Sequence, residues 1–262
     1  MKYRCVNLEV RLSNFSLLRI QMEIKEQALS KLANSMRLYG EAHMRFHKLK
    51  LVDGEEAINN LDCAFEAKLE AFHSLYDVTQ DGFDYFSHGD TALLILLRNA
   101  VHHRNHLLFK SWNQDIGLNN GHKKYLGAEF ILASHEVVDA FHVMKHFYKL
   151  EDFYSRIDPK LDSPYLVDRM KDKDKLKLLN QIKNELGFDL ITAYAKEGRY
   201  PTKQIYVNLI PIYISAVCKV FKVLSDQGIE FIGFDANAYK EPFTNELEVN
   251  FSSINYTPIR IF

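Results

Sequence analysis

The residues of this chain best suited to chemistry lie close together between positions 98 and 106. They are two arginines, three histidines and two asparagines: Arg98, Asn99, His102, His103, Arg104, Asn105 and His106. An imidazole, with an ordinary pKa of about 6.5, accepts and donates protons at neutral pH. A guanidinium is a permanent planar cation that pairs with phosphate oxygens. The cluster therefore indicates acid–base chemistry next to a phosphate group.

A single helix over residues 91–112 is predicted to position these side chains. The stretch contains neither glycine nor proline, and Asp90 before it is a suitable N-cap. Apolar residues recur at helical spacing, which predicts burial of its first half. At about 100° per residue, Asn99 and His103 lie about 40° apart around this helix, whereas Arg98 and His103 diverge by about 140°. Arg98 and His103 would therefore flank a cleft.

The segment RNAVHH, residues 98–103, resembles the signature of the HEPN superfamily (higher eukaryotes and prokaryotes nucleotide-binding). In that family an arginine, usually followed by a polar residue, precedes a histidine by four to six positions on a helix of a small bundle. Arg98 matches the arginine, Asn99 its polar neighbour and His103 the histidine. The resemblance covers this helix and, loosely, residues 20–155.

The resemblance implies an activity. Family members with an intact motif are typically metal-independent endoribonucleases of toxin–antitoxin, phage-defence and CRISPR systems, and two copies usually form one composite site. Such cleavage needs a base for the 2′-hydroxyl, an acid for the leaving 5′-oxygen and a cation for the phosphorane. We assign His103 to acid–base work, Arg98 to the phosphate, and Asn99 to orienting either one or the 2′-hydroxyl. The implied partners are RNA, a second copy and an antitoxin or defence protein, with no cofactor or metal.

Other side chains are predicted to support the site or bind RNA. These are His102, Arg104, His106, Lys123, Lys124 and Tyr125. The lysines would contact the RNA backbone, while Trp112, Phe109 and Tyr125 have rings on which unpaired bases can stack. Core packing is the favoured role for Phe109.

Two alternatives share parts of this pattern. One is a HEPN module that binds RNA or a nucleotide without catalysis. The other is a histidine-rich helical bundle that binds a metal, because three histidine pairs have the four-residue spacing that places both rings on one helix face. These pairs are His43 and His47, His102 and His106, and His142 and His146.

Composition predicts a folded chain with a large core. Of the 262 residues, 47% are hydrophobic and 13% are aromatic. The formal net charge of -1 argues against a basic surface coat, so nucleic-acid binding would be local. Between residues 98 and 124, five cationic side chains accompany one carboxylate, a local charge of +4.

The cysteines and the apolar runs predict a cytoplasmic protein. Cys5, Cys63 and Cys218 form no metal-spaced pair, a usage typical of a reducing compartment. The N-terminal segment lacks a signal-peptide core. The longest aliphatic run, residues 92–97, is far shorter than the roughly 20 residues that span a bilayer. We therefore predict no membrane segment.

The apolar patterns predict a mainly α-helical protein. Helices are expected at residues 20–51, 55–76, 91–112 and 128–154, a HEPN-like four-helix bundle, with residues 113–127 a loop. Further helices are expected at 176–196 and 202–227, the second kinked near Pro211. Strands at 4–12, 229–233 and 247–251 would join the termini in a small sheet. We predict a bundle with an N-terminal strand over residues 1–155 and a C-terminal extension packed on it over 156–262, connected through residues 155–174.

Overall fold

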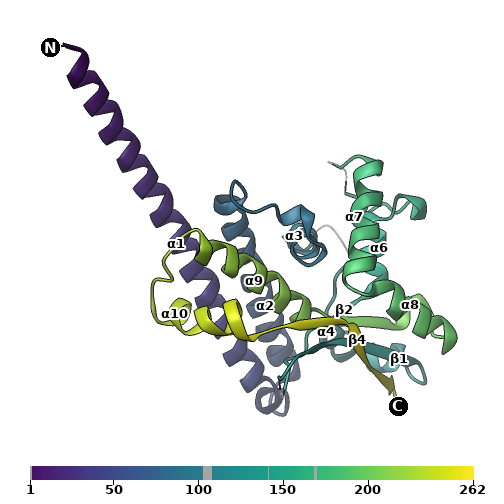
Figure 1. Ribbon diagram of the computed structural model, residues 1–262. Helices are drawn as coiled ribbons and strands as arrows, with labels where there is room; N and C mark the ends of the chain where they lie inside the picture. Colours follow the sequence, from purple (N-terminus) through teal and green to yellow (C-terminus); the bar gives the residue numbers. More distant parts are fainter. Residues whose placement is uncertain (1, 103–107, 141, 168–169) are drawn as a thin grey trace.

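The structure is a computed structural model that describes residues 2–102, 108–140, 142–167 and 170–262, with only the backbone described for residues 2–18. It confirms a mainly α-helical fold with a small sheet (Figure 1). Ten α-helices occur in the described residues: α1 (Lys2–Lys50), α2 (Gly54–Thr79), α3 (Gly89–His102), α4 (Trp112–Gly117), α5 (Gly121–Lys124), α6 (Leu150–Ile157), α7 (Asp172–Glu185), α8 (Phe188–Glu197), α9 (Leu209–Asp226) and α10 (Phe234–Glu241). The strands in the same residues are β1 (Glu129–Val137), β2 (Phe147–Lys149), β3 (Ile205–Asn208) and β4 (Val249–Arg260).

Helices α1 and α2 form a long antiparallel hairpin. The carboxylate of Asp53 caps α2 by accepting a hydrogen bond of 2.9 Å from the backbone N–H of Glu56. The core face of α2 carries Ile58, Leu61, Phe65, Leu69 and Phe72, all buried, as their spacing predicts. The N-terminal part of α1 extends away from the rest of the chain (Figure 1).

Helix α3 lies inside the fold and contacts α2, α7 and α9. Residues 91–97 are buried without interruption. The carboxylate of Asp90 is also buried, where it accepts a hydrogen bond of 2.6 Å from the hydroxyl of Ser215 and pairs with the ammonium of Lys219, both on α9. Because a buried carboxylate needs such partners, this contact fixes the start of α3 against α9.

The sheet is mixed, with the strand order β2-β3-β1-β4. Strand β1 pairs parallel to β3 and antiparallel to β4, so that Glu129 lies opposite Arg260. Strand β2 pairs antiparallel to β3. The register between β1 and β4 shifts after His135, at an irregularity of the ladder. Segments on both sides of residue 155 therefore build one sheet.

The prediction that the two termini meet in a sheet is wrong. Residues 4–12 continue α1, and residues 229–233 form no strand. Figure 1 shows the N-terminal end of α1 and the C-terminus on opposite sides of the protein. The predicted strand at 247–251 lies at the start of β4, which begins at Val249.

The predicted fourth long helix, residues 128–154, is also wrong. This stretch forms β1, β2 and the start of α6. The described part of α3 runs to His102, and residues 108–110, which the helix predicted at 91–112 would include, are not helical. The predicted loop at 113–127 contains the short helices α4 and α5. The helix predicted at 202–227 begins at Leu209, so Pro211 falls in the first turn, where proline is tolerated without a kink.

A buried lysine joins three helices in the core. The ammonium of Lys68, on α2, lies 4.0 Å from the ring centroid of Tyr39 on α1 and 3.9 Å from that of Tyr213 on α9. The ring of Phe65 is 4.7 Å away. Cation–π contacts of this kind stabilise a buried ammonium, although burial still lowers the pKa of Lys68 well below its ordinary value.

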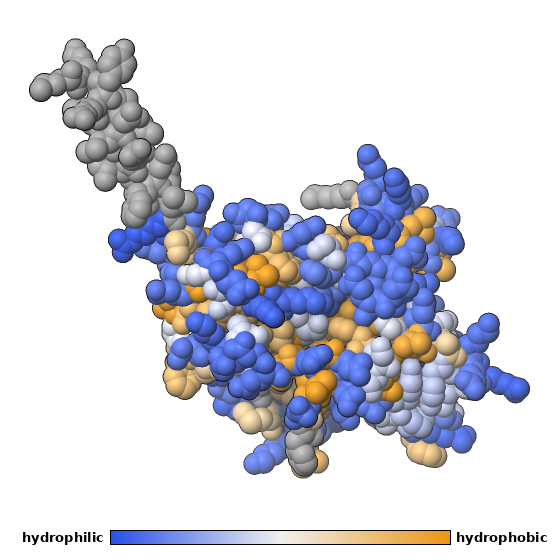
Figure 2. Space-filling model, viewed as in Figure 1, coloured by the Kyte–Doolittle hydropathy of each residue, from blue (hydrophilic) through white to orange (hydrophobic). Residues whose placement is uncertain are grey.

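The exterior of the protein is mostly hydrophilic on the face shown in Figure 2, where the hydrophobic patches are small and separate. Among the helices of the described residues, none has the length and apolar character required to cross a membrane. Cys63 and Cys218 are free thiols.

A buried histidine gives this fold a pH dependence that can be measured. His135 on β1 donates from Nε2 to the carbonyl of Leu186 at 2.8 Å, and burial lowers its pKa to about 4 from an ordinary value of 6.5. Between these values the unfolded chain binds a proton that the folded protein does not, so the free energy of unfolding falls as the pH falls. His135→Gln keeps an N–H donor but does not titrate. Between pH 7 and pH 4 its free energy of unfolding should therefore fall by up to about 3 kcal/mol less than that of the wild type.

Urea unfolding of both proteins at pH 7 and pH 4 measures the effect. The exposed His142 supplies the matched control, His142→Gln, which should follow the wild type. An equal loss of stability in His135→Gln and in the wild type would contradict the assignment.

Candidate functional site

The side chain of Arg98 lies near the C-terminal end of α3, where the helix leaves the core. Its Nε and Nη2 donate hydrogen bonds of 2.9 Å and 2.7 Å to Oε2 of Glu70 on α2. Its Nη1 donates a bond of 3.2 Å to the side-chain oxygen of Asn99. These contacts use three of the five N–H donors of a guanidinium. The plane of the guanidinium is therefore fixed by two neighbours.

Glu70 joins two members of the predicted site. While Oε2 accepts from Arg98, Oε1 lies 3.3 Å from Nδ1 of His102. The Arg98 side chain is 20% exposed and that of Glu70 is 41% exposed. A pair that is partly exposed to water contributes little to stability, and an incoming anion can reach the N–H donors of Arg98 that Glu70 and Asn99 do not engage.

An open groove of about 510 Å³ lies between α2 and α3 at this point. Its polar lining consists of Cys63, Glu66 and Glu70 from α2 and Arg98 and His102 from α3. We call it the motif groove. The two glutamates give it an acidic side, and Arg98 is the permanent cation among its described lining residues. An anion entering it would be drawn to Arg98 and repelled by Glu66.

The structure brings together Arg98, Asn99 and His102. His103, Arg104 and His106 lie outside the described residues, so the Arg98–His103 geometry stays a prediction. Lys123, Lys124 and Tyr125 do not line the motif groove. They lie on or directly after α5, where the Tyr125 ring makes an edge-to-face contact with Phe130.

Two acidic side chains, Asp152 and Asp62, hold the segment that leads into α4, at Phe109 and Ser111. Asp152 on α6 accepts a hydrogen bond of 2.9 Å from the backbone N–H of Phe109, which is buried as predicted and has a left-handed φ of 61°. Asp62 on α2 accepts a bond of 2.9 Å from the hydroxyl of Ser111. Burial raises the pKa of Asp62 to about 7 and that of Asp152 to about 6, and both hydrogen bonds oppose these shifts.

Glu70, Asp62 and Asp152 were not among the site residues predicted from the sequence. A signal for the first two was present, because Asp62, Glu66 and Glu70 recur every four residues along α2 and so follow one side of that helix. Only the fold reveals that this acidic stripe faces Arg98 and His102 on α3 and Ser111 before α4.

The histidine pairs occupy different surroundings. His43, His47 and His142 line a second cavity beside the sheet. His146 is buried in the core, where its ring stacks on Phe65 with centroids 3.9 Å apart. Within the part of the chain that the structure describes, no three or more histidine, cysteine or acidic side chains form a group able to hold a metal ion.

Comparison of the chain with protein-family models, with curated proteins and with solved structures finds no match.

The raised pKa of Asp62 predicts a second pH effect, opposite in sign to that of His135. Between the ordinary carboxyl pKa of 3.8 and about 7, the folded protein binds a proton at Asp62 that the unfolded chain has lost. The free energy of unfolding therefore falls as the pH rises through this range. Asp62→Asn keeps an acceptor for Ser111 and removes the titration, so its stability relative to the wild type should rise by at most about 4 kcal/mol between pH 4 and pH 8.

Chemical denaturation across that range provides the measurement. Asp226→Asn, at an exposed aspartate on α9, is the control and should show no such rise. If the difference in the free energy of unfolding between Asp62→Asn and the wild type stays constant with pH, Asp62 is not a protonated buried acid.

Proposed function

We propose that this protein is a metal-independent endoribonuclease that acts in the cytoplasm within a toxin–antitoxin or antiviral defence system. The observation that carries the proposal is the fixed guanidinium of Arg98, held by Glu70 and Asn99 at an open groove. It lies on the same helix end from which the chain continues into His103, the partner that the HEPN resemblance assigns to it. A phosphate-binding cation and a proton-transfer group therefore come from one short segment.

In the proposed reaction the RNA supplies its own nucleophile. The 2′-oxygen forms a bond to phosphorus, and the bond from phosphorus to the 5′-oxygen breaks, which yields a 2′,3′-cyclic phosphate and a 5′-hydroxyl. One group takes the 2′-hydroxyl proton and another protonates the leaving oxygen. Arg98 has two N–H donors that are not engaged by Glu70 or Asn99, and these would bind the phosphorane oxygens.

The reaction needs two proton-transfer groups, and the motif assigns one histidine per chain. A homodimer that places two motif grooves face to face would supply a second Arg98 and a second His103. The motif groove is open, so a second copy can approach it. An antitoxin or another partner from the same defence system would act by covering the groove.

Cleavage of RNA in the presence of a chelator tests the proposal. We expect the wild type to cut with EDTA present, and Arg98→Ala and His103→Ala to lose about 100-fold or more in kcat, because each removes a group that acts on the transition state. Arg98→Lys keeps the charge but not the planar fork, so it should also lose most of the activity.

Arg45→Ala is the matched control, because Arg45 is exposed on α1 and does not line the motif groove. It should cut like the wild type. If the folded wild type binds RNA and never cleaves it, the alternative of a non-catalytic RNA-binding module is correct. Activity that the chelator abolishes would favour the metal-binding bundle instead.

Glu70 is proposed as a positioning residue for Arg98. Removing its carboxylate in Glu70→Ala frees the guanidinium to rotate, so kcat should fall about tenfold while KM stays level or falls, since a competing negative charge is gone. Glu70→Gln keeps an oxygen that accepts from Arg98 and should recover part of kcat. Steady-state kinetics with a short RNA separates the two parameters, and a rise in KM with kcat unchanged would contradict this role.

A further inference from the structure

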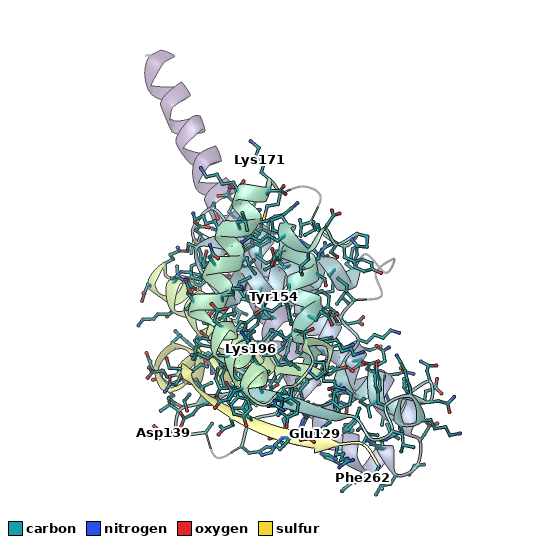
Figure 3. All side chains as sticks on the ribbon, turned by 90° about the vertical axis from the view of Figure 1, so that its right-hand side faces the viewer. Glu129, Asp139, Tyr154, Lys171, Lys196 and Phe262 are labelled. Atoms are coloured by element: carbon teal, nitrogen blue, oxygen red, sulfur yellow. The ribbon has the colours of Figure 1, made fainter. Side chains whose placement is uncertain are left out.

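A larger groove lies beside the sheet and shares no described lining residue with the motif groove. Its main cavity has a volume of about 720 Å³ and lies between the C-terminal part of α1, at His43 and His47, and the face of β1 and β4. A smaller cavity of about 290 Å³ adjoins it, because both are lined by Trp112, Asn113 and Ile259. We call the two together the sheet groove. Asp139 and Phe262, which line its two ends, lie toward opposite ends of the β1–β4 pair in Figure 3.

The floor of the sheet groove carries both polar and apolar side chains. Ser134 of β1 and Asn255 and Thr257 of β4 are among its polar residues, and Leu132 and Ile259 are among its apolar ones. Asn113 and Asn255 carry carboxamides, which offer both donors and an acceptor. A cavity of this size and lining suits a small polar molecule with a planar edge that forms hydrogen bonds.

Trp112 lines both cavities and is the one tryptophan in the sequence. It begins α4 directly after the N-cap Ser111. The indole makes edge-to-face contacts with Phe130 and Tyr206, each with ring centroids 5.0 Å apart, at interplanar angles of 74° and 80°. The ring is thereby held in one orientation while part of it lines the groove. A fixed, partly exposed indole is a suitable surface for stacking a planar base.

Two permanent cations lie at the Phe262 end of the sheet groove. The ammonium of Lys50 is 5.6 Å from the ring centroid of Phe46, and the guanidinium carbon of Arg260 is 5.9 Å from that of Phe262. Both side chains are exposed. The described lining of this end includes His122 and no aspartate or glutamate side chain. The acidic groups of the groove, Glu136 and Asp139, line the larger cavity.

We propose that the sheet groove binds a nucleotide, with the base stacked on Trp112 and the phosphate paired with Lys50 and Arg260. Indole, carboxamides and exposed cations in one groove match the ring, the hydrogen-bonding edge and the phosphate of a nucleotide. The nucleotide is either free or part of a single RNA strand. The strand form rests on the proposed function, as an anchor for the substrate outside the motif groove, whereas the free form does not.

The fluorescence of Trp112 reports binding directly, since no other tryptophan contributes to the emission. Full-length Arg98→Ala protein is titrated with AMP, with UMP, with hexauridylate and with inorganic phosphate. We expect saturable quenching by the nucleotide probes and none by inorganic phosphate. Quenching by AMP or UMP identifies a free-nucleotide site, and quenching by hexauridylate alone identifies a strand site.

The cations are tested in Lys50→Ala/Arg260→Ala, built on the same background. Because both side chains are exposed, this variant should fold, which circular dichroism checks. We expect Kd to rise about tenfold or more and its salt dependence to weaken, since two phosphate contacts are lost. The matched control is Arg45→Ala/Lys48→Ala, which removes two exposed cations of α1 that do not line the groove.

No quenching by any nucleotide, equal quenching by inorganic phosphate, or a Kd that Lys50→Ala/Arg260→Ala leaves unchanged would overturn the proposal. These results are separable from failure of the proposed function. If nucleotides quench the fluorescence but the wild type never cleaves RNA, the nucleotide site is supported and the ribonuclease activity is contradicted. If the wild type cleaves RNA with chelator present but no nucleotide quenches the fluorescence, the ribonuclease activity is supported and the nucleotide site is contradicted.

Discussion

The enclosure of α3 by α2, α7 and α9 is the constraint on which the arrangement of the site depends. A helix whose first half is buried on all sides cannot rotate, so each later position on it has a fixed direction. The carboxylate of Asp90, held by Ser215 and Lys219, sets the depth of the helix in the core. Arg98 is the first residue after this buried half, and the seam with α2 is where its side chain reaches water.

The helices with one apolar face were predictable from sequence, and the sheet was not. The extent of α2 and its cap at Asp53 follow from local rules that need no partner. Strand β1 was predicted as part of a helix. Strands β3 and β4 flank it and most of its side chains are buried, so its sequence is an apolar run without the alternation of a half-exposed strand. The strand predicted at residues 4–12 was wrong because a short alternating pattern, although compatible with a strand, lies within a segment that continues α1.

The sequence shows which residue types the candidate site contains, but not which side chains of other elements contact them. The motif names Arg98, Asn99 and His103; Arg98 and Asn99 are in contact, and His102, predicted only as a supporting residue, lines the same groove as Arg98. The carboxylate that orients Arg98 comes from α2, and that pairing depends on how two helices pack, which residue spacing alone does not determine. The same holds for Trp112, whose position beside β1 and β4 requires a sheet that the apolar pattern concealed.

The distances along the chain between the strands have a consequence for synthesis. The motif groove is lined by residues of α2 and α3, which are neighbours in sequence and can pack as soon as the ribosome releases them. The sheet groove needs Glu129 to find Arg260, a pairing of high contact order that forms late. During translation, therefore, the two helices that line the motif groove can meet before the surface beside Trp112 exists, and α3 is fixed in the core only once α9, with Ser215 and Lys219, has also been made.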